Sequence, residues 1–465
     1  MNIALVNTNR MKPAIAPIGL DYLAEVLNSA GHQVAVLDLC WSQDSERDIS
    51  NFFSQTSYPL VGISLRNTDD CAFTTRQSFV HDYAQIVNTI RRYSDAYLVC
   101  GGVGFSIMPE LILSLSGSDF GVWGEGEYAF LALAEQLSHH NWAAIPNLIW
   151  RNNGQWFHNA SESMPLEKLP TMTRRWFDNR RYFREGGQIG FETKRGCPFS
   201  CVYCADPIAK GKEVRLRPPK AVAVELQHLL DQGIDCYHTC DSEFNIPPAH
   251  ASAVCQEIIA RHLADKIKWY AYCSPTSFSY ELAQQMARAG CVGINFGVDN
   301  GDEKMLRRLK RDFTAREIET SARHCKNAGI RVMFDLLLGS PGETKESITT
   351  TIELMKKTDP HRVGVTFGVR LYPGTELTET LRKKQDCNGV TAGPELSEPI
   401  FFFEPGIAPD IYQTLSTLIR DDERFLFFNP ENPNKNYNYS AHEGLVQAIK
   451  QGHRGAYWDI LSKLS

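Results

Sequence analysis

The sequence KRGCPFSCVYCADP at residues 194–207 brings three cysteines, Cys197, Cys201 and Cys204, together on one short segment with the spacing C-x3-C-x2-C. Gly196 permits a tight backbone just before the first of them. Four-iron clusters normally take four thiolates, so a segment that offers three leaves one iron without a protein ligand. An open coordination position on a metal is a place for chemistry.

A zinc site is the alternative interpretation of this segment. Structural zinc takes four ligands, usually with the help of a second pair of cysteines or histidines. The next cysteine pair, Cys236 and Cys240, lies far along the chain in an apolar, strand-like run. The spacing therefore favours an iron–sulfur cluster over zinc.

The same run resembles the signature of the radical S-adenosylmethionine (radical SAM) enzymes, and Tyr203 before the third cysteine also matches it. The resemblance implies a [4Fe–4S] cluster held by Cys197, Cys201 and Cys204. It implies that the amino and carboxylate groups of SAM chelate the open iron. It further implies that an electron from the reduced cluster cleaves SAM and releases a 5′-deoxyadenosyl radical. An external donor such as flavodoxin or ferredoxin is expected to supply that electron.

The overall composition is that of a soluble globular protein. The chain has 465 residues, enough for two or three domains, with 43% hydrophobic and 22% charged residues. A net charge of −6 without a basic stripe argues against a nucleic-acid partner. No run of about 18 apolar residues predicts a membrane span. Thirteen cysteines without a secretory signal predict a reducing, cytoplasmic location.

Residues 1–140 alternate β-like runs with amphipathic helical runs, which predicts a doubly wound, Rossmann-like parallel sheet. The predicted strands are 3–6, 33–39, 60–65, 96–100 and 120–123, and the predicted helices are 19–30, 76–92 and 127–137. Ligands of such sheets bind at the carboxyl ends of the strands. Gly101 and Gly102 follow the fourth predicted strand and are candidates for close approach to a ligand.

Three short motifs of this N-terminal domain resemble cobalamin-binding domains that are fused to radical SAM barrels. They are PIGL at 17–20, VGIS at 61–64 and GGVGFS at 101–106. The best-known cobalamin domains carry Asp-x-His-x-x-Gly after the first strand, whereas this chain has NTNR at 7–10. The resemblance therefore implies cobalamin near Gly101 and Gly102 without a histidine from the first loop on cobalt. The alternative is a domain that has lost the corrin.

Residues 188–376 contain a second series of strands and helices. The predicted strands are 189–193, 236–239, 269–272, 293–297, 332–338 and 363–369. Six βα units fit a partial (β/α)6 TIM-type barrel, as the radical SAM resemblance also implies. Active sites of such barrels lie at the carboxyl ends of the strands, where the cysteine segment follows the first strand.

The two remaining regions carry no chemical signature. Residues 141–187 are predicted to be an interdomain linker with a hairpin that turns at 152–154. Its basic patch is expected to be solvated and structurally paired, with anion binding as the alternative; it consists of Arg174, Arg175, Arg180 and Arg181. Residues 377–465 are predicted to be a mainly helical cap, which either shapes a substrate pocket or simply packs on the barrel.

Acidic residues follow two of the predicted barrel strands. The radical SAM family often has Gly-Gly-Glu after the second strand, which holds the SAM ammonium. This chain has Asp241, Ser242 and Glu243 there, and either acid is a candidate for the contact. Asp299 follows the fourth strand, where the family often has an acid that binds the ribose hydroxyls. The alternative role of Asp299 is a cap for a helix at 302–309.

Further candidates for SAM binding follow the third and fifth strands. The sequence LGSPGE at 338–343 resembles a turn that passes close to the adenine in the family, so Gly339 and Pro341 are expected to approach SAM. Ser274 is a polar candidate after the third strand. No residue is assigned a catalytic role.

The combined motifs favour a cobalamin-dependent radical SAM enzyme that methylates an unactivated carbon of a small molecule. A second hypothesis keeps SAM cleavage and replaces methyl transfer by rearrangement, ring formation or transfer of another SAM fragment. A third hypothesis is a non-catalytic iron–sulfur protein. Asp299 and the glycine-rich strand ends favour the two enzymes over the third hypothesis, because they suit a small ligand.

Overall fold

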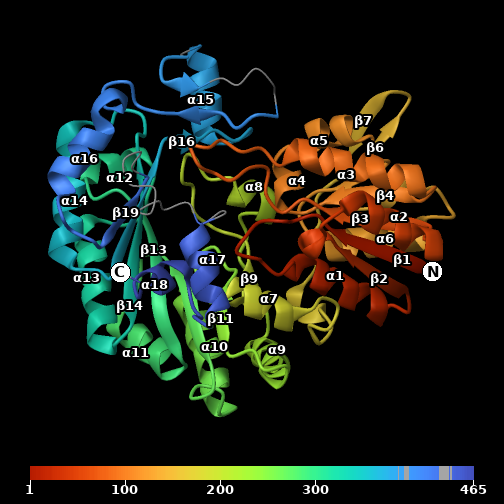
Figure 1. The fold of residues 1–465 in the computed structure, drawn as a ribbon, viewed down its shortest axis with the longest axis horizontal. Coiled ribbons are helices and arrows are strands. Elements are labelled where there is room, and N and C mark those ends of the chain that lie inside the picture. The colour runs from red at the N-terminus through yellow and green to blue at the C-terminus, as the bar shows by residue number, and fades with distance from the viewer. Residues whose placement is uncertain (386, 392–396, 429–438, 440–441, 465) are drawn as a thin grey trace.

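A computed structural model describes residues 1–385, 387–391, 397–428, 439 and 442–464. Each part of the chain builds its own mainly parallel sheet, and the two sheets lie on opposite sides of a central region (Figure 1). The boundaries predicted at residues 140, 187 and 376 remain predictions. Among the described helices, none combines the length and the apolarity that a membrane crossing requires.

The N-terminal sheet has the strand order β2-β1-β3-β4-β5-β6-β7. Its first five strands are parallel: β1 (Asn2–Asn7), β2 (Gln33–Asp38), β3 (Leu60–Ser64), β4 (Tyr97–Gly101) and β5 (Phe120–Val122). The helices are α1 (Ile18–Ser29), α2 (Ser45–Gln55), α3 (Val80–Tyr93), α4 (Val103–Ile107), α5 (Pro109–Ser116) and α6 (Gly126–Gln136). The predicted doubly wound domain is confirmed.

Four helices of this domain differ from the sequence-based expectation: α3 begins later than predicted, and α2, α4 and α5 were not predicted. The helix predicted at 76–92 begins only at Val80, because Arg76 has a φ of 46°, which a right-handed helix does not allow. Helix α2 was not predicted, since its sequence is polar and buries only Ile49 and Phe53. Those two side chains are four residues apart and therefore share one helix face.

The segment predicted as a linker extends the first sheet. Its hairpin, β6 (Leu148–Asn152) and β7 (Gln155–His158), turns where expected and pairs antiparallel with β5. Helix α7 (Asn179–Gly186) follows. The expectation of a solvated basic patch is wrong for Arg174, whose side chain is 1% exposed and pairs with Asp21 at 2.9 Å and with Glu225 at 2.7 Å.

Arg174 belongs to a buried polar network between the two sheets. Arg217 pairs with the second oxygen of Glu225 at 2.7 Å and donates to the hydroxyl of Tyr22. Tyr22 lies on α1, whereas Glu225 lies on α9 (Pro219–Asp231) of the second part. A lone buried charge would be strongly destabilising, but each charge here has opposite charges and donors around it. The network therefore holds the two parts in one relative position.

The second sheet has the order β19-β15-β14-β13-β12-β11-β8 and is entirely parallel. Its strands are β8 (Ile189–Phe191), β11 (Cys236–Thr239), β12 (Lys268–Cys273), β13 (Cys291–Asp299), β14 (Arg331–Leu338), β15 (Arg362–Phe367) and β19 (Phe425–Phe427). The helices between them are α9, α10 (Pro248–Ala260), α11 (Tyr280–Arg288), α12 (Glu303–Arg308), α13 (Ala315–Ala328) and α14 (Lys345–Thr358). The predicted partial barrel is confirmed.

The C-terminal region does more than cap this barrel. It is mainly helical, with α15 (Glu376–Lys384), α16 (Ile411–Ile419), α17 (Glu443–Lys450) and α18 (Tyr457–Leu461). It also supplies β19, which adds a seventh strand beside β15. This short strand was missed because its three residues, all buried, carry no alternation. A small sheet of β16 (Val369–Arg370), β18 (Phe401–Phe402) and β17 (Val390–Thr391) lies over the barrel.

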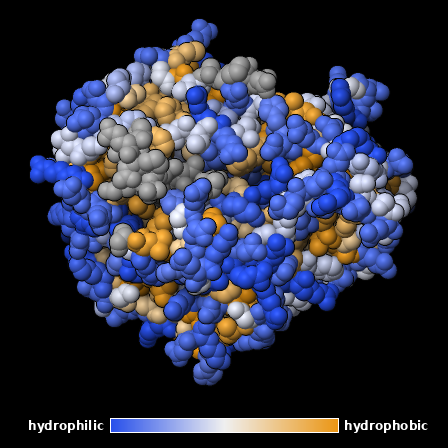
Figure 2. Space-filling view, viewed as in Figure 1, coloured by the Kyte–Doolittle hydropathy of each residue, from blue (hydrophilic) through white to orange (hydrophobic). Residues whose placement is uncertain are grey.

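One cluster of buried apolar side chains runs from the N-terminal sheet through α9 into the barrel. The shared core and the buried ion network join the two parts into a single body. Helices α17 and α18 lie in front of the gap between them (Figure 1). The face seen in Figure 2 is mainly hydrophilic, with hydrophobic residues in scattered groups.

Candidate functional site

The three motif cysteines lie on a loop between β9 (Lys194–Arg195) and α8 (Asp206–Lys210). Gly196 has a φ of 87°, and a Cβ atom there would lie 1.9 Å from the backbone oxygen of Glu213. Only glycine fits this position. The backbone of Val202 accepts a hydrogen bond from Leu377 at 2.8 Å and donates one to Leu309 at 3.2 Å. The loop is therefore held in a defined shape by backbone contacts.

The thiols of this loop are close enough to influence one another and are largely shielded from water. Burial raises the pKa of Cys201 to about 11 and raises the pKa values of Cys197 and Cys204 as well. Iron binding must therefore displace protons from all three. Among the described residues, no three His, Cys, Asp or Glu side chains lie close enough together to bind one metal ion. Cluster thiolates each bind a different iron, so the three thiols of a cluster site need not converge on one ion.

Asp299 lies beside this loop, at a bulge where β13 leaves the register of β14. It has a φ of 61° and accepts a hydrogen bond from the hydroxyl of Tyr203 at 2.6 Å. The alternative role as a helix cap is wrong, because Asp302 caps α12 through the backbone N–H groups of Lys304 and Met305. Asp299 is therefore free of a local backbone role and faces the cysteine loop.

Arg311 is a site residue that the sequence reasoning missed. Its Nη1 lies 3.0 Å from the Sγ atom of Cys201, and its Nε lies 3.4 Å from a carboxylate oxygen of Asp299. Its side chain is 6% exposed. No motif surrounds Arg311, and it stands 110 residues from Cys201 in the chain, so no sequence signal identified it.

The structure separates the roles of the two acids after β11. Both oxygens of Asp241 are used locally: they accept from the backbone N–H and the hydroxyl of Thr193, at 2.8 and 2.5 Å, so Asp241 holds the strand before the cysteine loop. Glu243 has a buried Oε2 atom without a hydrogen-bond partner. Burial raises the pKa of Glu243 to about 8, although Arg311 and Lys194 oppose the rise. An unpartnered buried carboxylate fits an ammonium group.

The remaining barrel candidates differ in accessibility. Ser274 is fully buried, and its backbone N–H and C=O bond to the side chain of Asn245. Gly339 has a φ of 97°, and its N–H donates to the carboxylate of Glu343. Glu343 thus holds the turn that contains Pro341. Gly339 is buried like Ser274, and Pro341 is partly exposed.

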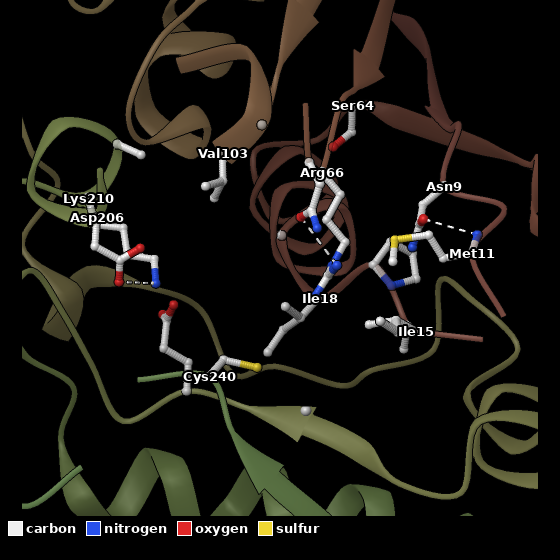
Figure 3. A pocket seen from close by; sticks show the side chains of 18 of the residues that line it. Asn9, Met11, Ile15, Ile18, Ser64, Arg66, Val103, Asp206, Lys210 and Cys240 are labelled. Carbon is white, nitrogen blue, oxygen red and sulfur yellow. Dashed lines mark hydrogen bonds and ion pairs between the residues drawn. The ribbon is translucent and has the colours of Figure 1, made fainter. Parts of the chain in front are cut away.

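A cavity of about 980 Å³ separates the barrel from the N-terminal domain. This volume is at the upper end of the range for small-molecule sites, which indicates a large ligand. Figure 3 shows Ile15, Ile18 and Arg66 on one side of it and Asp206, Lys210 and Cys240 on the other. Arg66 is exposed at this cavity.

Both glycines predicted for close approach line this cavity. Gly102 has a φ of 101°, and a Cβ atom there would lie 2.5 Å from the backbone oxygen of Leu65. At Gly101 the nearest atom to such a Cβ would be 3.6 Å away. Gly102 is therefore needed for the local backbone conformation, whereas the missing side chain at Gly101 leaves space on the cavity side. The cysteine loop borders the cavity through Gly196, while the three cysteines do not line it.

Aromatic side chains line the barrel side of the cavity. They include Tyr272, whose side chain is 43% exposed, together with His238 and Tyr457. The Nδ1 atom of His238 lies 2.9 Å from the backbone oxygen of Thr239, and burial lowers the pKa of His238 to about 4. The ring is therefore neutral, with a proton on Nδ1 and a free lone pair on Nε2.

Comparison with protein families matches both parts of the chain. The family described as B12 binding domain matches residues 5–134. The family described as Radical SAM superfamily matches residues 191–355. The second match contains the cysteine loop, Glu243 and Asp299, and the first contains Gly101 and Gly102.

Two relatives resemble nearly the whole chain. A tryptophan 2-C-methyltransferase of Streptomyces laurentii is 32% identical over 452 residues, which cover 83% of this chain and 75% of the relative. The radical SAM methyltransferase TsrM of Kitasatospora setae, with tryptophan and a SAM analogue bound, superposes with a TM-score of 0.92 at 29% identity. That superposition covers 99% of this chain and 97% of TsrM. A TsrM structure with cobalamin and a [4Fe–4S] cluster has a TM-score of 0.88 at 27% identity, over the same shares of the two chains.

Proposed function

Because the chain belongs to the family of cobalamin-dependent radical SAM methyltransferases, we propose that it methylates a carbon of an aromatic small molecule, with tryptophan as the first candidate. Its cofactors are a [4Fe–4S] cluster, SAM and cobalamin. The observation that carries the proposal is the cavity of about 980 Å³, which borders the cysteine loop on one side and the glycine-rich strand ends on the other.

Cys197, Cys201 and Cys204 would hold the cluster. Their spacing supplies three thiolates, and their loop is held by backbone contacts that do not depend on metal. When bound and reduced, the cluster supplies the electron that cleaves SAM. We also propose that an external one-electron donor such as flavodoxin or ferredoxin reduces it. The thirteen cysteines, all free of disulfides, support the proposal of a reducing, cytoplasmic location.

Three groups at the barrel strand ends would bind SAM. Glu243 would accept the ammonium, because its buried Oε2 has no other partner. Asp299 would accept the ribose hydroxyls through the oxygen that Tyr203 leaves free. Gly339 and Pro341 would lie against the adenine, since Glu343 holds their turn in place. Asp241 and Ser274 would contribute only indirectly, by holding the neighbouring backbone.

The N-terminal strand ends would bind cobalamin. Gly101 leaves space beside the cavity, and Gly102 permits the backbone conformation that packs this strand end against Leu65. The first loop, which carries Asn7 and Asn9 at the cavity wall, supplies amides and no imidazole. We therefore propose that no histidine from this loop binds cobalt. Electron paramagnetic resonance of the Co(II) form should then show no nitrogen splitting from an axial ligand.

The aromatic lining of the barrel side supports an aromatic substrate. The exposed ring of Tyr272 and the neutral ring of His238 lie with centroids 4.8 Å apart and can pack against a planar ligand. The free Nε2 of His238 accepts a hydrogen bond, which an indole N–H would donate. These features favour an aromatic amine or indole over an aliphatic substrate.

Isotope transfer tests this function directly. The chain is reconstituted without oxygen with iron, sulfide and hydroxocobalamin, and is then given a one-electron reductant, SAM with a deuterated methyl group, and tryptophan. We expect a product that is heavier than tryptophan by one deuterated methyl group, with the label on a ring carbon. Cleavage of SAM without labelled product from tryptophan or other indoles would contradict the proposed substrate class. Absence of both cobalt and methyl transfer would contradict the methyltransferase proposal itself.

A further inference from the structure

Resting on the proposed cluster site, we propose that Arg311 is a positioning residue that raises the reduction potential of the cluster by donating a charged hydrogen bond to the sulfur of Cys201. The Nη1–Sγ distance of 3.0 Å lies within the range of an N–H···S contact. Nothing in the proposed binding of SAM or cobalamin requires an arginine at this position.

The guanidinium is held so that its donors point at the cysteine loop. Its Nη2 donates to the backbone oxygen of Gly297, and its plane lies over Phe313 with 4.9 Å from the guanidinium carbon to the ring centroid. Its Nη1 also lies 3.4 Å from the hydroxyl of Tyr203. The contacts to β13 and to Phe313 limit the directions in which the side chain can point. Cys201 therefore receives its donor from a preorganised group.

The electrostatics of the contact have a definite sign. Reduction adds one electron to the cluster, so the reduced form carries one more negative charge. A neighbouring positive charge and a hydrogen bond to a cluster sulfur both stabilise that form and raise the potential. The charge of Arg311 is retained, because a guanidinium stays protonated in proteins and the carboxylate of Asp299 lies 3.4 Å from its Nε. The carboxylate of Asp299 opposes the effect through space, while Arg311 is the group in contact with sulfur.

A merely structural role is the alternative. Arg311 bonds to Gly297 and lies 3.4 Å from Asp299, so its loss could disturb β13 without any effect on electrons. The two roles differ in what they change. A structural role alters stability or iron content, whereas a tuning role alters the potential of a cluster that still holds its full iron content.

The experiment measures the potential of the cluster by spectroscopically monitored redox titration of the full chain, reconstituted without SAM or substrate. Arg311→Met removes the charge and both donors, and Arg311→Lys keeps the charge but loses the planar fork. Arg307→Met is the matched control, because it removes the same charge from a side chain of α12 that is 69% exposed. Iron per chain and Tm are measured for each variant.

We expect Arg311→Met to shift the reduced-to-oxidised ratio at a given potential at least tenfold toward the oxidised form, which is about 59 mV for a one-electron couple. Arg311→Lys should shift it less in the same direction, and Arg307→Met should leave it unchanged. A potential of Arg311→Met equal to that of the control, at full iron content, would overturn the proposal. If Arg311→Met fails to hold iron, the test passes to Arg311→Lys. A reduction potential of Arg311→Lys equal to that of the wild type would then overturn the proposal. A wild-type chain without a cluster would contradict the proposed function and not this inference alone.

Discussion

The two walls of the central cavity use different chemistry, although both are the carboxyl ends of parallel strands. The N-terminal wall offers strand-end backbone at Gly101 and Gly102 and the amide of Asn9. Its charged lining residues include Arg66, which is exposed, and Glu127, which is paired with Arg195. The barrel strand ends and the cysteine loop behind them carry buried charges, among them Asp299 and Arg311. The same strand-end geometry thus serves two kinds of ligand.

This difference matches the ligands that we assign to each wall. A corrin presents a rim of neutral amides, which neutral backbone groups can satisfy without burying charge. SAM and an iron–sulfur cluster are charged, and buried charges need opposite charges or donors nearby. Each wall can therefore be disabled separately, and substitutions on one wall should leave the ligand of the other in place.

The largest effect should come from the cysteine loop. Replacing Cys197, Cys201 and Cys204 with alanine should remove essentially all iron and abolish SAM cleavage, because no other thiol of the loop can replace them. Iron and sulfide analysis of the reconstituted protein checks this. A matched variant in which the exposed thiols Cys71, Cys240 and Cys387 become alanine should keep the cluster. Retention of four irons in the first variant would contradict the assignment.

The opposite wall is tested by Gly101→Leu. A Cβ atom at Gly101 has no close neighbour, so the chain should fold, while the leucine side chain fills space that the corrin needs. We expect most of the cobalt to be lost and the iron content to remain. Gly406→Leu, at an exposed position where a Cβ atom would be 3.9 Å from its nearest neighbour, should keep both metals. Normal cobalt in Gly101→Leu would show that the corrin lies elsewhere.

Asp299 and Asp302 offer a finer test within the charged wall. Asp299→Ala should weaken SAM binding by about ten- to a hundredfold, the effect of losing a hydrogen bond worth roughly 1.5–3 kcal/mol. Asp302→Ala should instead lower stability by ~1 kcal/mol through the lost helix cap and leave SAM affinity unchanged. Calorimetric titration with SAM and thermal melting of both variants distinguish the two roles. Equal SAM affinities in the two variants would remove Asp299 from the ribose site.

The smallest effect concerns His238, which lies on the barrel side of the cavity. Its folded pKa of about 4 lies below the ordinary value of 6.5 because the ring is buried. Between these values the unfolded chain binds a proton that the folded chain does not, so stability falls as the pH falls from about 6.5 to 4. His238→Gln removes this pH-dependent contribution to the stability of the folded chain. The Tm of the wild type should therefore decrease relative to that of the variant across this window, and parallel curves would contradict a buried, neutral ring.

The fold and the cysteine loop were predictable because their signals are local. Strands of the two sheets are buried apolar runs, and the helices between them show their periodicity over a few turns. The roles of Asp241 and Glu243 were not separable in this way, since the two acids are neighbours in the chain. The structure separates them, because Asp241 binds Thr193 whereas the buried Oε2 atom of Glu243 has no hydrogen-bond partner.

The sequence by itself determined the order of the two parts, the three thiols of the cluster loop and the glycines at the strand ends, because spacing within a short segment encodes these features. The tertiary structure alone decided that Arg174 is buried, that β19 completes the barrel sheet and that Arg311 contacts Cys201. The contact of Arg311 joins residues 110 positions apart, and nothing in the short segment around either residue encodes the other. Such contacts arise only when the strands close into one sheet and bring their carboxyl ends together.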